Sequence, residues 1–185
     1  MSWISVVDEA DATGKVKRIY EEILRKRGKI SNIMKIHSLN PDAMKEHMKL
    51  YLTLMFGSSG IPREERELIA VVVSTVNHCE YCINHHAEAL NHYWKNNELT
   101  QKLIQDYKSI ALSDRKCKML DYVVKLTKTP YAIEQADIDS LRKSGFSDED
   151  ILNINLITCY FNFVNRIALG LGVNFSSDEI KGYNY

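Results

Sequence analysis

Two cysteines three residues apart stand among histidines in the segment VNHCEYCINHHAEAL, residues 76–90. A Cys-x-x-Cys pair at the start of a helix has both sulfurs on one face, within one turn of each other. The helix N-terminus also lowers the pKa of a cysteine, because it favours the thiolate over the thiol. Cys79 and Cys82 are therefore candidates for a couple that cycles between dithiol and disulfide.

A possible base for this dithiol lies one helical turn further on. His86 follows Cys82 by four residues, so on a helix its imidazole lies beside that sulfur. A neutral imidazole there can take the thiol proton, and the imidazolium then stabilises the thiolate. The spacing indicates Cys82 as the activated nucleophile, with Cys79 placed to close a disulfide.

Glu67 reaches the same place if the chain reverses direction near residues 77–78. In the resulting antiparallel helix pair, Glu67 would lie about 15 Å from the turn and His86 about 12 Å, nearly level with each other. A carboxylate beside an imidazole fixes its tautomer and raises its basicity. We therefore predict a proton relay in the order Glu67, His86, Cys82.

The elements that must position these residues all have helix signals. Proline, serine and acidic residues stand at several expected N-termini, and Ser147 with Asp150 forms a capping box. The segment LIAVVVSTV, residues 68–76, would pass for a buried strand, but its proline-led acidic start favours a buried helix. Besides the helix of the cysteines, we expect helices over 14–27, 41–56, 62–77, 98–111, 114–129, 134–144 and 148–171. The sequence thus predicts an all-α fold.

The length of 185 residues is typical of one domain, here residues 1–185. A weak internal repeat appears when the chain is shifted against itself, and it pairs residues of about 62–95 with about 145–173. In this alignment Cys79 and Cys82 fall on Asn162 and Asn165. If the repeat is real, the same helical hairpin occurs twice and only its first copy carries the dithiol.

Composition excludes several classes of partner. Lys and Arg number 24, as do Asp and Glu, and no basic stripe is visible, so we expect no nucleic-acid partner. The N-terminus lacks the pattern of a secretory signal, and the most apolar segment, 151–173, contains four asparagines and an arginine, so we expect no membrane span. We expect the protein to be cytoplasmic, where thiols are kept reduced. Its four cysteines then serve in catalysis, metal binding or packing rather than in a disulfide framework.

A zinc site is the main alternative interpretation of the cysteine-rich segment. Cys79, Cys82 and His86, with His78 or His85, could supply four ligands, although this crowds them within nine residues, an awkward geometry. The remaining cysteines and histidines have no visible chemistry. We expect Cys117 and Cys159 to serve in packing and His85 to face solvent or cap a helix, and the sequence shows no visible partner for His37, His47 or His92.

The spacing Glu67, eleven residues, Cys79, two residues, Cys82, three residues, His86 resembles the active-site motif of the alkylhydroperoxidase (AhpD-like) family. That family lies within the larger carboxymuconolactone decarboxylase-like group. The flanking segments ERELIAVVVSTVNHCEYCINHHAEAL and NFVNRIALGLGV resemble its peroxidase-related branch, and the similarity extends over residues of about 15–175.

The resemblance implies an all-helical fold with a duplicated unit that assembles as trimers or hexamers. It implies that Cys82 attacks a hydroperoxide and becomes a sulfenic acid, that Cys79 resolves it to a disulfide, and that His86 and Glu67 move the proton. No metal or organic cofactor is implied, and the reductant would be a dithiol or a lipoyl-type donor. Thiol–disulfide exchange with another substrate and a redox-sensing module without turnover stay open as alternatives.

Tyr81 departs from the family pattern, because the best-known members have a histidine just before the second cysteine. A tyrosine hydroxyl, with an ordinary pKa near ~10, is a poor base at neutral pH. We therefore expect the relay to operate without a base at this position.

Overall fold

The computed structural model describes residues 2–184, and within them the regular structure is entirely helical. The prediction of an all-α fold is confirmed. The α-helices are α1 (Gly14–Arg27), α2 (Asn32–Lys35), α3 (Pro41–Phe56), α4 (Arg63–Val76), α5 (Glu80–Trp94), α6 (Asn97–Gln105), α7 (Asp114–Lys128), α8 (Gln135–Lys143) and α9 (Asp148–Gly170). Short 3₁₀ turns cover Glu9–Asp11, Ile36–Leu39, Tyr107–Ser109 and Pro130–Ala132.

Helix α4 forms the centre of the molecule and packs against α3, α5, α6, α7 and α9. Its residues from Glu65 to Ser74 are all buried. This burial explains the apolar pattern of LIAVVVSTV, since a helix surrounded by other helices needs apolar side chains on every face. Pro62 precedes the helix, and Glu64 and Glu65 lie in its first turn, as expected for a helix N-terminus.

The chain reverses direction between α4 and α5, which is the condition on which the predicted relay depended. His78 adopts a left-handed conformation with φ of 55°, and the Cys79 amide donates to the Ser74 carbonyl oxygen at 2.9 Å. The Asn77 side-chain amide donates to the Oδ1 atoms of Asn162 and Asn165 on α9, at 3.1 and 2.9 Å. These bonds fix the turn that starts the helix of the cysteines.

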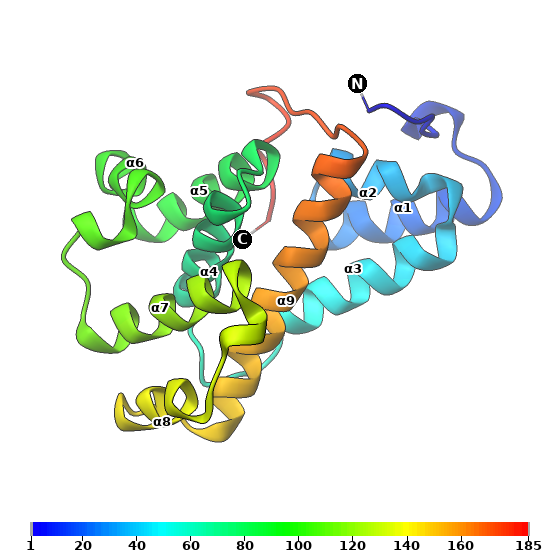
Figure 1. Cartoon of the computed structure of the whole chain (residues 1–185). Helices are drawn as coiled ribbons and strands as arrows, with labels where there is room; N and C mark the ends of the chain where they lie inside the picture. Colours follow the sequence, from blue (N-terminus) through cyan, green and yellow to red (C-terminus); the bar gives the residue numbers. More distant parts are fainter. Residues whose placement is uncertain (1, 185) are drawn as a thin grey trace.

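Helix α9 runs between the α1–α3 group and the α5–α7 group (Figure 1). It begins at the predicted capping box, in which Ser147 and Asp150 bond to each other's backbone amides. Where the first segment of the expected repeat contains two helices and a turn, the second contains this one continuous helix. The shared hairpin is therefore not seen in the second segment, because Tyr160 and Phe161 continue the helix at the position of the α4–α5 turn.

The C-terminal segment after α9 folds back across α5 (Figure 1). The Asn184 amide donates to the carbonyl oxygen of Arg27, the last residue of α1, at 2.9 Å. Helix α6 is shorter than predicted. It stops at Gln105 because the Asp106 side chain accepts from the Lys108 amide and begins a separate 3₁₀ turn. No helix within residues 2–184 combines the length and apolarity that crossing a membrane requires.

Candidate active site

The two cysteines of the segment 76–90 meet at the start of α5. Cys79 is the N-cap residue, Cys82 lies in the first turn, and their sulfurs are 3.0 Å apart. Both are buried free thiols. The separation is longer than the ~2.05 Å of a disulfide but close enough for one sulfur to hydrogen-bond the other.

The two thiols share their protons. The pKa of Cys79 is lowered, mainly by the hydrogen bond with Cys82, whereas that hydrogen bond and burial raise the pKa of Cys82 well above its ordinary value. Such a pair titrates as a unit, and one proton stays between the sulfurs after the first ionisation. The first proton to leave is therefore that of Cys79, whereas the spacing indicated Cys82 as the thiolate. Transfer of the shared proton over 3.0 Å moves the charge to Cys82.

A pocket of about 80 Å³ is lined by only one of the two cysteines. Cys82 lines this pocket together with His86, whereas Cys79 does not line it. A small substrate that enters the pocket therefore meets Cys82 first. Most of the other side chains around it are aromatic, aliphatic or basic: Arg27, Lys29, Ile33, Met34, Met48, Tyr51, Tyr81, His85, Tyr160, Phe161, Val164 and Tyr183.

Glu67 and His86 lie together across the α4–α5 pair. The imidazole Nδ1 is 2.7 Å from Glu67 Oε2, and the glutamate side chain is completely buried. Arg63, one turn earlier on α4, donates from Nε to the other carboxylate oxygen at 3.0 Å. Burial alone would raise the pKa of Glu67, but His86 and then Arg63 outweigh burial and lower it. An ionised carboxylate accepts the Nδ1 proton, which leaves His86 Nε2 as the basic nitrogen.

The other end of the expected relay is less direct. Within residues 2–184, Glu67 is the only hydrogen-bond partner of His86, so the imidazole makes no hydrogen bond with either sulfur. His86 and Cys82 line the same pocket, where a substrate can lie between them. The Phe161 ring packs edge-on against the imidazole, with centroids 4.5 Å apart, and holds it in place.

Arg63 and Asn165 are site residues that the sequence reasoning did not assign. Arg63 precedes Glu67 by four residues, a spacing at which opposite charges pair on a helix, so this contact had a local signal. Asn165 hydrogen-bonds Ser74 on α4 at 3.1 Å, and its side chain also lowers the pKa of Cys82. The sequence marked Asn165 only as a polar residue in an apolar helix.

Comparison with known proteins gives two kinds of match. Residues 41–105 match the carboxymuconolactone decarboxylase family. A crystal structure of a peroxidase-related protein from Silicibacter sp. TM1040 is 31% identical, covers 97% of this chain and 94% of its own, and has a TM-score of 0.88. The chain belongs to the AhpD-like carboxymuconolactone decarboxylase family.

Two further solved structures resemble this AhpD-like protein. An alkylhydroperoxidase AhpD core protein from Ralstonia eutropha JMP134 is 28% identical, with a TM-score of 0.87 and coverage of 97% of this chain and 94% of that one. The debrominase Bmp8, in a complex with 2,3,4-tribromopyrrole, is 18% identical, with a TM-score of 0.78 and coverage of 98% and 100%. The second likeness concerns the fold alone. No curated protein matches the sequence.

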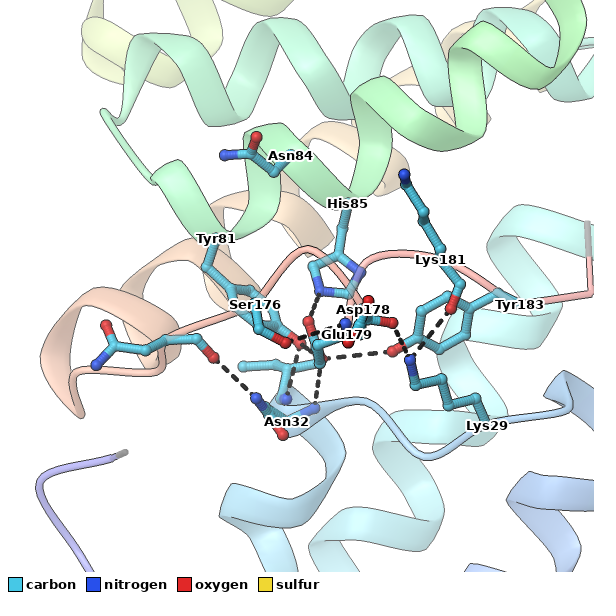
Figure 2. A network of polar contacts seen from close by, with 12 residues as sticks. Lys29, Asn32, Tyr81, Asn84, His85, Ser176, Asp178, Glu179, Lys181 and Tyr183 are labelled. Atoms are coloured by element: carbon cyan, nitrogen blue, oxygen red, sulfur yellow. Dashed lines mark hydrogen bonds and ion pairs between the residues drawn. The ribbon is translucent and has the colours of Figure 1, made fainter.

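Tyr81, the position at which this AhpD-like protein departs from the family motif, belongs to a separate polar network (Figure 2). Its hydroxyl donates to Glu179 Oε1 and accepts from the Ile33 amide, each at 3.0 Å. Burial and the charge of Glu179 raise the pKa of Tyr81 well above its ordinary value. Tyr81 is therefore no base for the dithiol, and it anchors the C-terminal segment.

His85 points to the same carboxylate, since its Nε2 is hydrogen-bonded to Glu179 Oε2 (Figure 2). The expectation that His85 faces solvent or caps a helix was wrong. Its partner lies 94 residues later in the chain, where no local pattern points to it.

The histidines His37 and His47 also have partners, which the sequence did not show. His37 Nδ1 lies 2.8 Å from the Ile33 carbonyl oxygen, His47 Nδ1 lies 3.1 Å from His37 Nε2, and His47 Nε2 lies 2.7 Å from the Tyr160 hydroxyl. Tyr160 is on α9, so the sequence around His47 gave no sign of this contact.

The residues of the alternative zinc site do not converge. His86 directs its Nδ1 at Glu67 and His85 its Nε2 at Glu179, away from a common point with the two sulfurs. Across residues 2–184 no three His, Cys, Asp or Glu side chains are arranged to hold a metal ion. Of the other cysteines, Cys117 is half-buried, whereas Cys159 is exposed on α9 and is not the packing residue that was expected.

Proposed function

We propose that this protein is a thiol-dependent peroxidase that reduces hydroperoxides at Cys82 and forms a Cys79–Cys82 disulfide. One observation carries the proposal. A dithiol with sulfurs 3.0 Å apart is open to a pocket on the Cys82 side alone, and a carboxylate-bound imidazole lines the same pocket. A nucleophile and a proton carrier thereby share one small space, and the resolving thiol lies 3.0 Å from the nucleophile.

The reaction begins with the first ionisation of the dithiol. One proton passes to His86, and the other moves to Cys79, which leaves the thiolate on Cys82. This thiolate attacks the terminal oxygen of a hydroperoxide, the one that carries the hydrogen. The S–O bond forms, and the O–O bond breaks. His86 returns its proton to the departing alkoxide, which leaves as an alcohol. The sulfur of Cys82 is oxidised to a sulfenic acid, and the peroxide is reduced.

The second step closes the disulfide. The Cys79 sulfur attacks the Cys82 sulfenic sulfur, and its proton leaves with the hydroxyl group as water. Because the sulfurs are already 3.0 Å apart, only a small movement brings them to bonding distance. A dithiol reductant, of lipoyl type by family resemblance, then restores the reduced pair by thiol–disulfide exchange.

The test is a single-turnover reaction of reduced protein with one equivalent of tert-butyl hydroperoxide, followed by intact-protein mass. We expect a prompt loss of two hydrogens that maps to Cys79 and Cys82. The variant Cys82→Ser should not react, and Cys79→Ser should accumulate a sulfenic acid that dimedone traps. Cys159→Ser, which removes an exposed thiol outside the pocket, is the matched control and should react like the wild type. An unchanged wild-type mass would contradict the proposal.

A second candidate is thiol-based reduction of an aromatic halide. The observation in its favour is the aromatic wall of the pocket, to which Tyr51, Tyr160, Phe161 and Tyr183 contribute. The debrominase Bmp8, a fold neighbour, is solved with 2,3,4-tribromopyrrole. In such a reaction the dithiol becomes a disulfide, and the C–Br bond is replaced by C–H with release of bromide and a proton. Bromide release from that compound by reduced protein would favour this candidate.

A further inference from the structure

A chain of hydrogen bonds connects the 3₁₀ turn Ile36–Leu39 with the wall of the pocket. It runs from the Ile33 carbonyl oxygen through His37 and His47 to the Tyr160 hydroxyl, with distances of 2.8, 3.1 and 2.7 Å. His37 is half-buried, while His47 and Tyr160 are each 6% exposed. The mechanism proposed above uses none of these side chains.

The carbonyl oxygen at the start of this chain fixes the direction of every bond in it. A carbonyl can only accept, so His37 carries its proton on Nδ1, and its Nε2 in the neutral ring is an acceptor. His47 must therefore donate from Nδ1 to His37, which leaves His47 Nε2 as an acceptor. The hydroxyl of Tyr160 then donates to His47, and its single proton is committed to that bond.

This direction requires that both imidazoles stay neutral, and their surroundings ensure it. Burial lowers the pKa of His37 from its ordinary value. Burial, together with the nearby His37, lowers the pKa of His47 to about 3. At neutral pH the bonds therefore keep one orientation.

Tyr160 ends the chain in the wall of the pocket, to which Cys82 and His86 also contribute. Burial raises the pKa of Tyr160 well above its ordinary value, and the charges of Tyr51 and of a Cys82 thiolate raise it further. Its ring is held edge-on by Phe161 at 5.2 Å between centroids. Because its proton points to His47, the Tyr160 oxygen offers only lone pairs to a molecule in the pocket.

We propose that the Tyr160 oxygen accepts a hydrogen bond from the O–H group of the hydroperoxide and so turns the terminal peroxide oxygen toward Cys82. Tyr160 is a catalytic residue in this sense, and His47 and His37 are positioning residues that hold its proton away from the substrate. The inference rests on the proposed peroxidase function and specifies a peroxide with a free O–H as its substrate. During attack the S–O bond forms and the O–O bond breaks. The hydroxyl proton stays on the oxygen that Cys82 acquires, and His86 protonates the leaving alkoxide.

The variant Tyr160→Phe tests the inference, because it removes the acceptor and keeps the ring. Two single-turnover rates are measured on reduced protein: disulfide formation with tert-butyl hydroperoxide, and reaction of the dithiol with the disulfide reagent 5,5′-dithiobis(2-nitrobenzoate). We expect the first rate to fall about tenfold, the usual upper effect of one neutral hydrogen bond, and the second to stay unchanged. Tyr122→Phe is the control, since it removes a buried hydroxyl that bonds Asn155 and does not line the pocket.

His47→Leu provides a second variant with the acceptor still present. Without His47, the Tyr160 proton is free to turn into the pocket, and we expect a fall in the hydroperoxide rate in the same direction, again without change toward the disulfide reagent. An equal loss of both rates in Tyr160→Phe would indicate a merely structural role and overturn the inference, as would a wild-type hydroperoxide rate in that variant. A wild-type protein that does not react with hydroperoxide overturns the proposed function and the inference together.

Discussion

The single residue on which the proposed chemistry depends most is Glu67, a fully buried carboxylate that binds the guanidinium of Arg63 and the imidazole of His86. Arg63 holds one oxygen and His86 the other, and the lowered pKa of Glu67 keeps it ionised. A glutamate in the first turns of a helix commonly does no more than complement the helix dipole. Here the contact with His86 gives the same residue a role in orienting the proposed base.

Glu67→Gln should therefore slow the reaction of the dithiol with tert-butyl hydroperoxide. The neutral amide no longer stabilises the imidazolium, and we expect a fall of about 10²-fold, the lower end of a general acid–base contribution. Glu64→Gln is the matched control on the same helix, because its carboxylate binds Lys116 and Trp94 instead. Equal rates in the two variants, measured by intact mass against time on samples with native circular dichroism, would remove Glu67 from the mechanism.

His47 should make the stability of the fold depend on pH. Its pKa of about 3 in the folded state lies below the value of about 6.5 expected in the unfolded chain, so the unfolded state binds more protons between these values. Stability is thus complete above about pH 6.5 and falls as the pH drops toward 3, by up to ~1.4 kcal/mol per pH unit from this group.

Urea unfolding between pH 7 and pH 5 measures this dependence. The lowered pKa values of His37 and His85 act in the same direction, so we expect His47→Gln to reduce the slope without abolishing it. A slope in His47→Gln equal to that of the wild type would show that His47 is not neutral in the folded protein.

At the scale of elements, Glu179 makes several of the contacts that attach the C-terminal segment 174–184 to the helices. Glu179 accepts from the Asn32 amide at 2.9 Å, from Tyr81 at 3.0 Å and from Tyr183 at 3.4 Å, besides its bond with His85 (Figure 2). Burial by itself would raise the pKa of Glu179, but His85 and these donors outweigh it and lower it. The segment contributes Tyr183 to the pocket wall, so its attachment also shapes the pocket.

Glu179→Ala should release this segment while leaving the helices in place. Four donors lose their acceptor, and we expect the free energy of unfolding to fall by about 1–3 kcal/mol, the cost of unsatisfied buried donors. Amide hydrogen exchange in residues 176–184 should accelerate, and Cys82 should react faster with 5,5′-dithiobis(2-nitrobenzoate). Asp178→Ala, which removes an exposed neighbouring carboxylate, should change none of the three quantities: the free energy of unfolding, the exchange rates or the reaction rate of Cys82. Unchanged exchange in Glu179→Ala would show that other contacts hold the segment.

At the scale of the whole molecule, helix α9 presents apolar side chains to the outside. Leu152, Leu156 and Phe163 are 57%, 40% and 50% exposed. Their spacing of four and seven residues places them on one face of the helix together with the exposed Cys159. Family resemblance implies trimers or hexamers, and this face is where we expect a second copy of the chain to pack.

Light scattering of the purified protein tests the expectation. The mass should be a multiple of the 21.3 kDa chain, and Leu156→Glu should lower it, because a charge on a packed apolar face opposes association. Tyr131→Glu changes a more accessible side chain, 88% exposed, in the 3₁₀ turn Pro130–Ala132 rather than on α9, and should leave the mass unchanged. A wild-type protein of single-chain mass at micromolar concentration would contradict the expectation.

The sequence by itself determined the helical fold and the pairing of α4 with α5. Capping residues, proline at helix starts and apolar periodicity act within a few residues, so they can be read along the chain. The same locality brought Cys79, Cys82 and His86 to one helix, and the turn at Asn77 and His78 then placed Glu67 beside the imidazole. The short helix α2 was not predicted, and the end of α6 was misjudged because the Asp106 side chain begins a new turn there.

The tertiary structure alone decided which groups face the pocket and which partners the buried polar side chains have. It turned Cys82 rather than Cys79 toward the pocket, bound Tyr81 and His85 to Glu179, and paired His47 with Tyr160, 113 residues away. A buried polar group must find a partner, but the requirement does not say where along the chain that partner is. The packing of α3, α5, α9 and the C-terminal segment determines which buried polar groups become partners, and no local sequence pattern predicts these pairs.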